Sequence, residues 1–404
     1  MQLTEVDLYS PDTYIDRVPH DVFKLLRRES PVHWHREASG PGYWALTKYD
    51  DIVAVSQDSA TFSSARMGTN IDDPSPDGLA MLQTIMLNMD PPRHTVYRRL
   101  VATGFTPSMI RKLEPHVRAI TTDIVDRVAR SGECDFVTAV AAELPLQVIT
   151  EMVGVPHDDR HKIFDWSNRL IGFDDPEMTT SPEDGQRAAT ELFLYAHQLA
   201  AQRRDTPRDD LVSVLLQAEV DGAALSEPEF DAFFLLLCVA GNETTRNLIS
   251  GAMRTFIEHP HQRRRLIDDP ALMPLAVEEM LRWVSPLIYF RRTATRDTEI
   301  RGQRIREGDK VVMYYPSANR DEEIFDDADT FDVGRAQNPH VAFGGGGHHF
   351  CLGASLARLE IKVMFEEIFR RLPDIELAGE PRRLRSNFIN GLKHLPVRYT
   401  PERA

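Results

Sequence analysis

Apolar residues recur every three or four positions between residues 105 and 216, which is the spacing of one face of an α-helix. The clearest case is 106–132, where Gly132 follows a segment whose apolar face consists of Ile110, Leu113, Val117, Ile120, Ile124 and Val128. We therefore expect this part of the chain to be mostly helical.

A second long helix is predicted from Ser226 to Glu258. Ser226 can cap it and Glu229 can complete a capping box, while Pro228 is tolerated in the first turn. Its first half is apolar on all faces, and the apolar run from Phe233 is too short to span a bilayer. This helix, roughly 50 Å long at 1.5 Å per residue, should therefore run through the middle of the molecule.

Segments that alternate apolar and polar residues predict a smaller β portion, at 31–35, 42–49, 297–305 and 309–315. A last long helix is expected after residue 353 and before Pro373, with its inward face formed by Leu356, Leu359, Val363 and Ile368. No repeat or interdomain linker is visible. We predict one domain over 1–404, mainly α with a minor β portion.

The composition is ordinary for a soluble globular protein, with 42% apolar and 27% charged residues among 404. The formal net charge of −15 argues against a general affinity for nucleic acid or anionic membranes. The three cysteines, Cys134, Cys238 and Cys351, cannot all pair, which favours a reducing compartment. The first residues lack the basic start and apolar core of a signal peptide, so we expect a cytoplasmic protein without a membrane anchor.

The segment AFGGGGHHFCLGASLAR, residues 342–358, concentrates the candidate chemistry. A phosphate-binding loop needs a lysine and a hydroxyl after its glycines, structural zinc needs paired ligands, and a redox dithiol needs a second cysteine; the segment offers none of these. A cysteine that opens a helix can be held as a thiolate, and glycines before it let the backbone approach a flat ligand. That arrangement describes a haem-thiolate site, with a free buried cysteine in a glycine-rich turn as the alternative.

This segment resembles the FxxGxHxCxG signature of the cytochrome P450 family. The match comprises Gly346, His349, Cys351 and Gly353. The resemblance implies a triangular, helix-rich P450 fold that holds haem b between the long helix and the cysteine loop, with Cys351 as the iron ligand and Phe343, Gly344 and Gly353 as further cofactor contacts. An extra glycine lengthens the spacing from Phe343 to Cys351, and His348 stands where small residues are usual; the sequence explains neither.

Glu279 and Arg282 lie three residues apart on one helix face and can pair, and Arg335 from a later loop can join them. In isolation such a motif is typical of a surface salt bridge. Upstream of the cysteine it resembles the ExxR triad of the family, which implies a structural role around the haem-binding core.

The segment AGNETT, which begins at Ala240, places a glycine, an acid and two hydroxyls within the apolar helix. Gly241 costs about 1 kcal/mol relative to alanine, which suggests close approach to a ligand or a local opening of the helix. By resemblance, Glu243 relays protons to bound dioxygen with the help of Thr244, and Ala240 contacts the cofactor. Thr245 is a weaker candidate, and a kinked helix with satisfied polar groups is the alternative.

Haem propionates require basic partners, and several cations stand at positions that match the propionate clamps of the family: His94, Arg98, Arg292 and His349. Each of them alone would be an ordinary surface cation. Arg99 and Arg291, which neighbour two of the clamp positions, are expected to face solvent or a partner.

The family resemblance implies a monooxygenase that inserts one oxygen atom from O2 into a C–H bond of a hydrophobic substrate. Stretches such as SPLIYFRRTATRD and FINGLKHLPV resemble enzymes that hydroxylate terminal methyl groups of sterol side chains, methyl-branched lipids and alkanes. The expected pocket lining is apolar and consists of Met81, Ile85, Met86, Leu236, Leu237, Leu287, Ile288, Phe388 and Ile389. Core packing is the alternative for each of these residues.

Three other functions stay open: a terpene or polyketide hydroxylase, a peroxygenase that uses hydrogen peroxide, and a haem-binding sensor. The Glu243–Thr244 pair counts against the last two. The chain has no flavin or nicotinamide fingerprint, so the resemblance implies a ferredoxin-type iron–sulfur donor with an NAD(P)H-dependent reductase. We expect a monomer that docks this donor on the cysteine side, over a basic patch of Arg98, Arg99, Arg111, Lys112 and Arg358.

Overall fold

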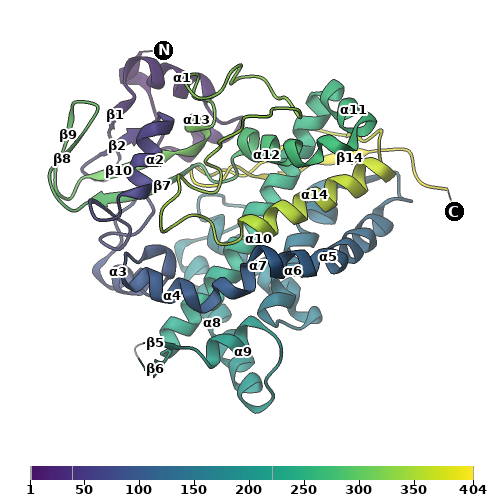
Figure 1. The fold of residues 1–404 in the computed structure, drawn as a ribbon, viewed down its shortest axis with the longest axis horizontal. Coiled ribbons are helices and arrows are strands. Elements are labelled where there is room, and N and C mark those ends of the chain that lie inside the picture. The colour runs from purple at the N-terminus through teal and green to yellow at the C-terminus, as the bar shows by residue number, and fades with distance from the viewer. Residues whose placement is uncertain (1, 39, 221, 404) are drawn as a thin grey trace.

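Helices dominate the architecture (Figure 1). The computed structural model describes residues 2–38, 40–220 and 222–403. Helix α10 (Glu227–Glu258) crosses the middle of the molecule, and the helices that pack against it include α6 (Glu143–Val153), α12 (Met273–Val284) and α14 (Ala354–Arg371). The expectation of a mainly α fold with a minor β portion is confirmed.

The other helices surround this centre. They are α1 (His20–Glu29), α2 (Tyr49–Gln57), α3 (Pro76–Leu82), α4 (Arg93–Ala102), α5 (Pro107–Val128), α7 (Arg160–Ile171), α8 (Pro182–Asp205), α9 (Leu211–Leu216), α11 (Pro260–Asp268) and α13 (Tyr315–Ala318). Short 3₁₀ turns lie at Leu3–Glu5, Pro11–Tyr14, Met86–Asn88, Thr103–Phe105, His157–Asp159 and Pro270–Leu272, and a π turn at Val137–Ala141.

The main sheet has five strands in the order β1 (Val32–His35), β2 (Tyr43–Leu46), β10 (Lys310–Tyr314), β7 (Tyr289–Ala294) and β3 (Phe62–Ser63). Strands β2 and β10 run parallel, and the other neighbours run antiparallel. A small sheet joins β11 (Glu376–Leu377), β14 (Pro396–Arg398) and β4 (Glu133–Asp135). Two-stranded pairs form from β5 (Glu219–Val220) and β6 (Ala223–Ala224), from β8 (Thr298–Ile300) and β9 (Gln303–Ile305), and from β12 (Arg382–Arg383) and β13 (Leu392–His394).

The local signals in the sequence account for the main elements. Ser226 and Glu229 form the predicted capping box of α10, and the Ser226 N–H donates to Glu229 Oε2 at 2.9 Å. The predicted apolar face of α5 is buried apart from Leu113, which packs partly buried against the same core. The expected strand 297–305 is instead a hairpin, because Gly302 takes a positive φ of 78° between β8 and β9.

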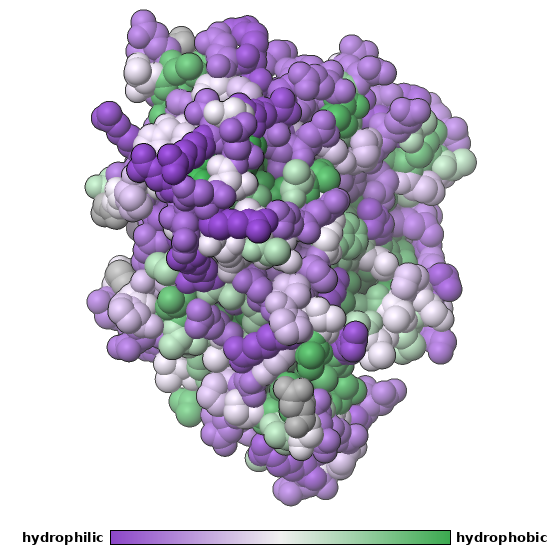
Figure 2. Space-filling view, turned by 60° about the vertical axis from the view of Figure 1, so that its left-hand side comes forward, coloured by the Kyte–Doolittle hydropathy of each residue, from purple (hydrophilic) through white to green (hydrophobic). Residues whose placement is uncertain are grey.

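Apolar side chains are concentrated in the interior. The face drawn in Figure 2 is mostly hydrophilic, and its apolar residues form small, separate groups. Within the described residues, no helix combines the length and the apolarity needed to cross a membrane.

Candidate active site

The loop that carries Cys351 leads directly into α14. It closes on itself, because the Cys351 N–H donates to the Phe343 carbonyl at 3.0 Å. The side chain of Cys351 is exposed, although protein atoms surround its sulfur closely. This burial raises the pKa of the Cys351 thiol, whereas the Gly353 N–H and the charges of Arg98 and Arg358 lower that pKa.

The glycine run before the cysteine packs against α2. A Cβ atom on Gly345 would lie 2.6 Å from Ser56 Oγ, and one on Gly347 would lie 2.6 Å from the Ser56 carbonyl oxygen. Gln57 Nε2 donates to the Gly345 carbonyl at 3.2 Å. The expectation that these glycines serve a flat ligand is therefore wrong for Gly345 and Gly347, which allow the loop to approach a helix. Gly353 is different, because no other atom lies within 4 Å of its Cβ position.

The contact with α2 gives a stability prediction with a matched control. Gly347 and Gly302 both have positive φ, at 73° and 78°, but only Gly347 is crowded. We expect Gly302→Ala to lower the free energy of unfolding by about 1–2 kcal/mol through the left-handed conformation alone. Gly347→Ala should lose a further ~1–3 kcal/mol, because the clashing Ser56 carbonyl belongs to a helix backbone. Equal losses in urea unfolding of the two variants would contradict this account of the glycine run.

Four basic residues from three segments lie near the cysteine. His94 and Arg98 come from α4, Arg292 from β7 and His349 from the cysteine loop. The rings of His94 and His349 are 4.2 Å apart between centroids, and His349 Nε2 is 3.2 Å from Ser64 Oγ. His94 is 1% exposed, and within the described chain its Nδ1 has no hydrogen-bond partner.

Burial and mutual repulsion disfavour the charged forms of these basic groups. Burial lowers the pKa of His94 to about 4, and the charge of Arg98 adds to that effect. Burial and the charge of Arg292 lower the pKa of His349 to about 2. Burial also lowers the pKa of Arg292 itself. A cluster of this kind suits an anion, because carboxylates placed among these groups would restore the favourable pairing.

One face of α10 opens inside an otherwise buried helix. Leu236, Ala240 and Thr244 are four residues apart; Ala240 is exposed, the other two are half-buried, and Thr244 Oγ1 donates to the Ala240 carbonyl at 3.0 Å. The expectation that Gly241 allows a ligand to approach is wrong. A Cβ atom on Gly241 would lie 2.8 Å from Ile149 Cγ1, so this glycine lets α6 pack closely on α10.

Glu243, Thr244 and Thr245 of the AGNETT segment contact different neighbours. Glu243 is fully buried and forms an ion pair with Arg246, a partner that the spacing of three residues could have indicated. Burial raises the pKa of Glu243, and Arg246 opposes that rise. Thr245 hydrogen-bonds Glu360 of α14, where burial raises the pKa of the Glu360 carboxyl to about 8. Thr244 alone of these lies on the open face.

The Glu279–Arg282 pair ties α12 to the segment before the cysteine loop. Both side chains are fully buried, with Arg282 Nε 2.7 Å from Glu279 Oε2. Arg335 Nε lies 3.2 Å from the same oxygen. Arg282 also donates to the carbonyls of Asn319 and Ala328 at 2.8 and 2.9 Å. The structure thus joins the three residues predicted as a triad, and it extends their contacts to the backbone of the preceding loop.

The predicted pocket residues divide into three groups. Half-buried side chains are Ile85, Leu236, Leu287 and Phe388, whereas Met81 of α3 is 50% exposed and Met86 and Leu237 are buried. Ile288 and Ile389 are 0% and 1% exposed. The prediction is wrong for these two, because side chains without exposed surface belong to the core and leave nothing for a ligand to contact.

Two arginines differ from expectation. Arg291 is 1% exposed and pairs with Asp73 at 2.7 Å, so the prediction that it faces solvent is wrong. Arg358 binds Glu278 through two hydrogen bonds of 2.7 and 2.8 Å and lies over the Phe343 ring. Its charge is thus already paired within the chain.

Comparison with known proteins places this geometry in a family. The family model described as Cytochrome P450 matches residues 16–373. The chain belongs to the cytochrome P450 family. It is 44% identical to the steroid C26-monooxygenase of Rhodococcus jostii, over 97% of this chain and 84% of that one. It is 43% identical to a methyl-branched lipid omega-hydroxylase of Mycobacterium bovis, over 99% of this chain and 95% of that one.

Solved P450 structures share the fold. A cytochrome P450 of Mycobacterium marinum in complex with pseudoionone has a TM-score of 0.91 and 40% identity, with 98% of both chains covered. A Bacillus megaterium P450 in complex with testosterone has a TM-score of 0.85 and 34% identity, covering 95% of this chain and 98% of that one. This P450 is therefore a monooxygenase with haem as its cofactor.

The residues present fit that cofactor. The exposed Cys351 thiol offers one sulfur ligand for iron. The cluster of His94, Arg98, Arg292 and His349 offers cations and one unpartnered buried nitrogen for two propionates. The exposed Ala240 on α10 and the open space beside Gly353 offer surfaces without bulky side chains for a flat ring.

Proposed function

We propose that this P450 hydroxylates a terminal methyl group of a sterol side chain or a methyl-branched lipid. The observation that carries the proposal is the near-complete alignment, at 43–44% identity, with a steroid C26-monooxygenase and a methyl-branched lipid omega-hydroxylase. Both printed activities act on the end of a branched hydrocarbon chain. The apolar, half-buried side chains of Leu236, Leu287 and Phe388 suit such a chain.

The proposed reaction combines the substrate C–H bond, O2, two electrons and two protons, and it yields the alcohol and one water. Haem supplies the activation of O2 when it is bound. Cys351 would hold the iron, and His94, Arg98, Arg292 and His349 would bind the propionates. The remaining task of the chain is to exclude water, orient the methyl group and deliver protons.

Thr244 and Glu243 are the proposed route for these protons. Thr244 lies on the open face of α10, and its hydroxyl can exchange the 3.0 Å bond to the Ala240 carbonyl for a bond to a water in the site. Glu243 is held by Arg246, so its carboxylate must leave that ion pair to pass a proton toward Thr244. The ion pair with Arg246 would thus hold the Glu243 carboxylate between turnovers.

Replacement of Thr244 tests the proton route. We expect Thr244→Ala to keep consuming NAD(P)H while product formation falls by about 10²-fold, the lower range for losing a positioned proton donor. Thr244→Ser keeps the hydroxyl and should restore much of the coupling. If product formed per NAD(P)H is the same in Thr244→Ala as in the unaltered enzyme, Thr244 has no part in proton delivery.

Matched ligand pairs test the substrate class. A sterol with its full side chain should bind more tightly than the same nucleus without it, and it should cause a larger shift of the haem absorption. An iso-branched fatty acid should likewise bind more tightly, and with a larger absorption shift, than its straight-chain isomer. Pseudoionone, bound in the Mycobacterium marinum structure, supports a terpene hydroxylase as the alternative; a preference for such ligands over both sterol and branched acid would favour that function.

We infer that electrons come from a ferredoxin-type iron–sulfur protein and its NAD(P)H-dependent reductase. Arg99, Arg111 and Lys112 are exposed, and Phe350 of the cysteine loop, whose carbonyl accepts from Arg98 at 2.7 Å, is 41% exposed. Arg358 is better omitted from this patch because Glu278 pairs with it. A cytoplasmic, monomeric enzyme formed by one domain over 1–404 remains our prediction.

Charge reversal tests the docking patch. We expect Lys112→Glu to slow ferredoxin-supported turnover several-fold at low salt and to flatten its salt dependence, because exposed charges steer association. Glu219→Lys on β5, an exposed charge change far along the chain, is the control. Unchanged rate and salt dependence in Lys112→Glu would place the donor elsewhere.

A further inference from the structure

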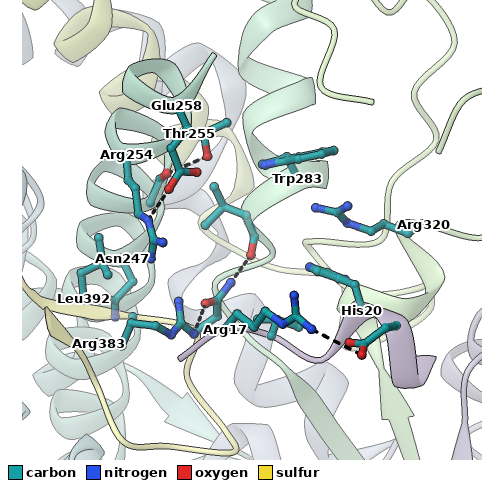
Figure 3. Close-up of a pocket in the computed structure, with 16 residues that line it drawn as sticks. Arg17, His20, Asn247, Arg254, Thr255, Glu258, Trp283, Arg320, Arg383 and Leu392 are labelled. Atoms are coloured by element: carbon teal, nitrogen blue, oxygen red, sulfur yellow. Dashed lines mark hydrogen bonds and ion pairs between the residues drawn. The ribbon is translucent and has the colours of Figure 1, made fainter. Parts of the chain in front are cut away.

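A cavity lies apart from the residues proposed for haem and substrate (Figure 3). Its volume is about 250 Å³. It is formed where α1, the second half of α10, the end of α12 and β13 meet, and its polar lining includes Arg17, His20, Asp21, Asn247, Arg254, Thr255, Glu258, Arg320, Arg383 and Asn390. Four arginines from distant parts of the chain therefore face one small space.

Two of these arginines have carboxylate partners in the lining. Arg254 Nε binds Glu258 Oε1 at 2.7 Å, one turn along α10. Arg17 lies 3.4 Å from Asp21, and both side chains are largely exposed. Each of the two acidic residues in the lining thus pairs with one arginine. Neither of them forms an ion pair with Arg320 or Arg383.

Arg320 and Arg383 are less well compensated. Arg320 is 8% exposed; its nearest carboxylate, Asp329, is 3.6 Å away, and among the described residues its Nε has no hydrogen-bond partner. Arg383 donates to two neutral oxygens, the Tyr14 carbonyl at 3.0 Å and Asn390 Oδ1 at 2.9 Å. Burial lowers the pKa of each guanidinium to about 10, and neighbouring arginines add to the effect.

Unpartnered polar atoms line the same cavity. Asn247 is 1% exposed, and within the described chain neither its Oδ1 nor its Nδ2 has a hydrogen-bond partner. The same holds for His20 Nδ1. In Figure 3 the Arg320 side chain lies below Trp283, and Arg320 and His20 point across the cavity toward the side from which Arg383 and Asn247 reach in. Buried polar groups of this kind are normally satisfied, so these atoms are available to a ligand or water held in the cavity.

We propose that this cavity binds a small molecule that carries a phosphate or carboxylate group. Arg320, whose guanidinium carbon lies 3.7 Å from the centroid of the Trp283 ring, and Arg383 would take the negative charge, and Asn247 and His20 would complete the hydrogen bonds. The ligand would connect α1, α10 and α12, and α10 also carries Thr244. The site is independent of the substrate proposed above.

Calorimetric titration of the haem-loaded enzyme at constant ionic strength tests the site, with inorganic phosphate and succinate as separate probes. We expect saturable binding of at least one probe with a Kd below about 1 mM, and a rise in Tm of a few degrees at saturation. Arg383→Gln should weaken binding about tenfold or more, as expected for one charge-assisted contact. Arg264→Gln, an exposed arginine outside the cavity, should bind as the unaltered enzyme does.

Arg17→Glu provides a second variant that is safe for folding, because this side chain is 74% exposed. It places a negative charge at the cavity mouth and should weaken binding several-fold. Binding of phosphate alone would define a phosphate ester site, and binding of succinate alone a carboxylate site; either supports the proposal. No saturable binding of either probe would overturn the proposal, and so would an affinity equal to that of the unaltered enzyme in both Arg383→Gln and Arg17→Glu. Neither result bears on the hydroxylase proposal.

Discussion

Replacing Cys351 by serine is expected to abolish the strongly red-shifted carbon monoxide band of the reduced enzyme and to reduce product formation to background. A thiolate donates electron density to the iron, and a serine hydroxyl cannot do so at neutral pH. The Gly353 N–H and the charges of Arg98 and Arg358 favour the thiolate against the burial of the sulfur. Absorption spectroscopy and product assay measure the two effects.

Cys134→Ser is the matched control, because Cys134 is half-buried on β4 and belongs to none of the proposed sites. We expect it to keep both the band and the activity. Retention of the shifted band in Cys351→Ser would show that the iron ligand is another residue. Haem content and the unfolding midpoint of each variant show whether a lost band reflects lost ligation or a lost fold.

Glu279→Gln is expected to lower the free energy of unfolding by about 3–5 kcal/mol. The substitution removes the buried negative charge that Arg282 and Arg335 share. Glu279 accepts from Arg282 at 2.7 Å and from Arg335 at 3.2 Å, and its own side chain has no exposed surface. The loop from 319 to 335 would lose its anchor on α12, so we also expect weaker haem retention.

The neighbouring Glu278 provides the control. Glu278 pairs with Arg358 and with His340 Nε2 at 3.0 Å, but the Glu278 and Arg358 side chains are partly exposed, at 28% and 37%. Glu278→Gln should cost about 1–2 kcal/mol, less than Glu279→Gln, because this carboxylate and its arginine keep contact with solvent. Urea unfolding of the two variants measures the difference. If Glu279→Gln is no less stable than Glu278→Gln, the buried triad does not hold the core together.

Short-range sequence signals predicted much of the fold. The capping box of Ser226 and Glu229, the apolar face of α5 and the alternating strands at 31–35 and 309–315 each depend on neighbouring residues, so the chain itself displays them. The hairpin at 298–305 required knowing that Gly302 turns the chain with a positive φ. A local pattern thus indicates that a helix or strand is present more readily than it indicates where that element ends.

Contacts between distant segments decided the points at which prediction failed. The sequence predicts that Gly241, Gly345 and Gly347 adjoin a ligand, whereas Gly241 adjoins Ile149 of α6 and the other two adjoin Ser56 of α2. Arg291 was placed in solvent because its partner, Asp73, lies far back in the chain. His348 is exposed with its ring 6.3 Å from that of His94, a neighbour that the sequence could not indicate.

For the same reason, the sequence did not indicate the arginine-lined cavity. Arg17, Arg254, Arg320 and Arg383 are spread over most of the chain, and no motif joins them. Family resemblance recovered the candidate haem residues because those positions sit in recognisable local motifs. It carried no information about a site that assembles from isolated arginines.

The most direct test of the central claim is product analysis after turnover under ¹⁸O2 with a sterol that carries a branched side chain. The proposed function predicts a primary alcohol at a terminal methyl group, with a single ¹⁸O atom from O2. Thr244→Ala should give the same product in much smaller amount. An alcohol on the sterol nucleus or at an internal chain carbon, or oxygen derived from water, would contradict the account.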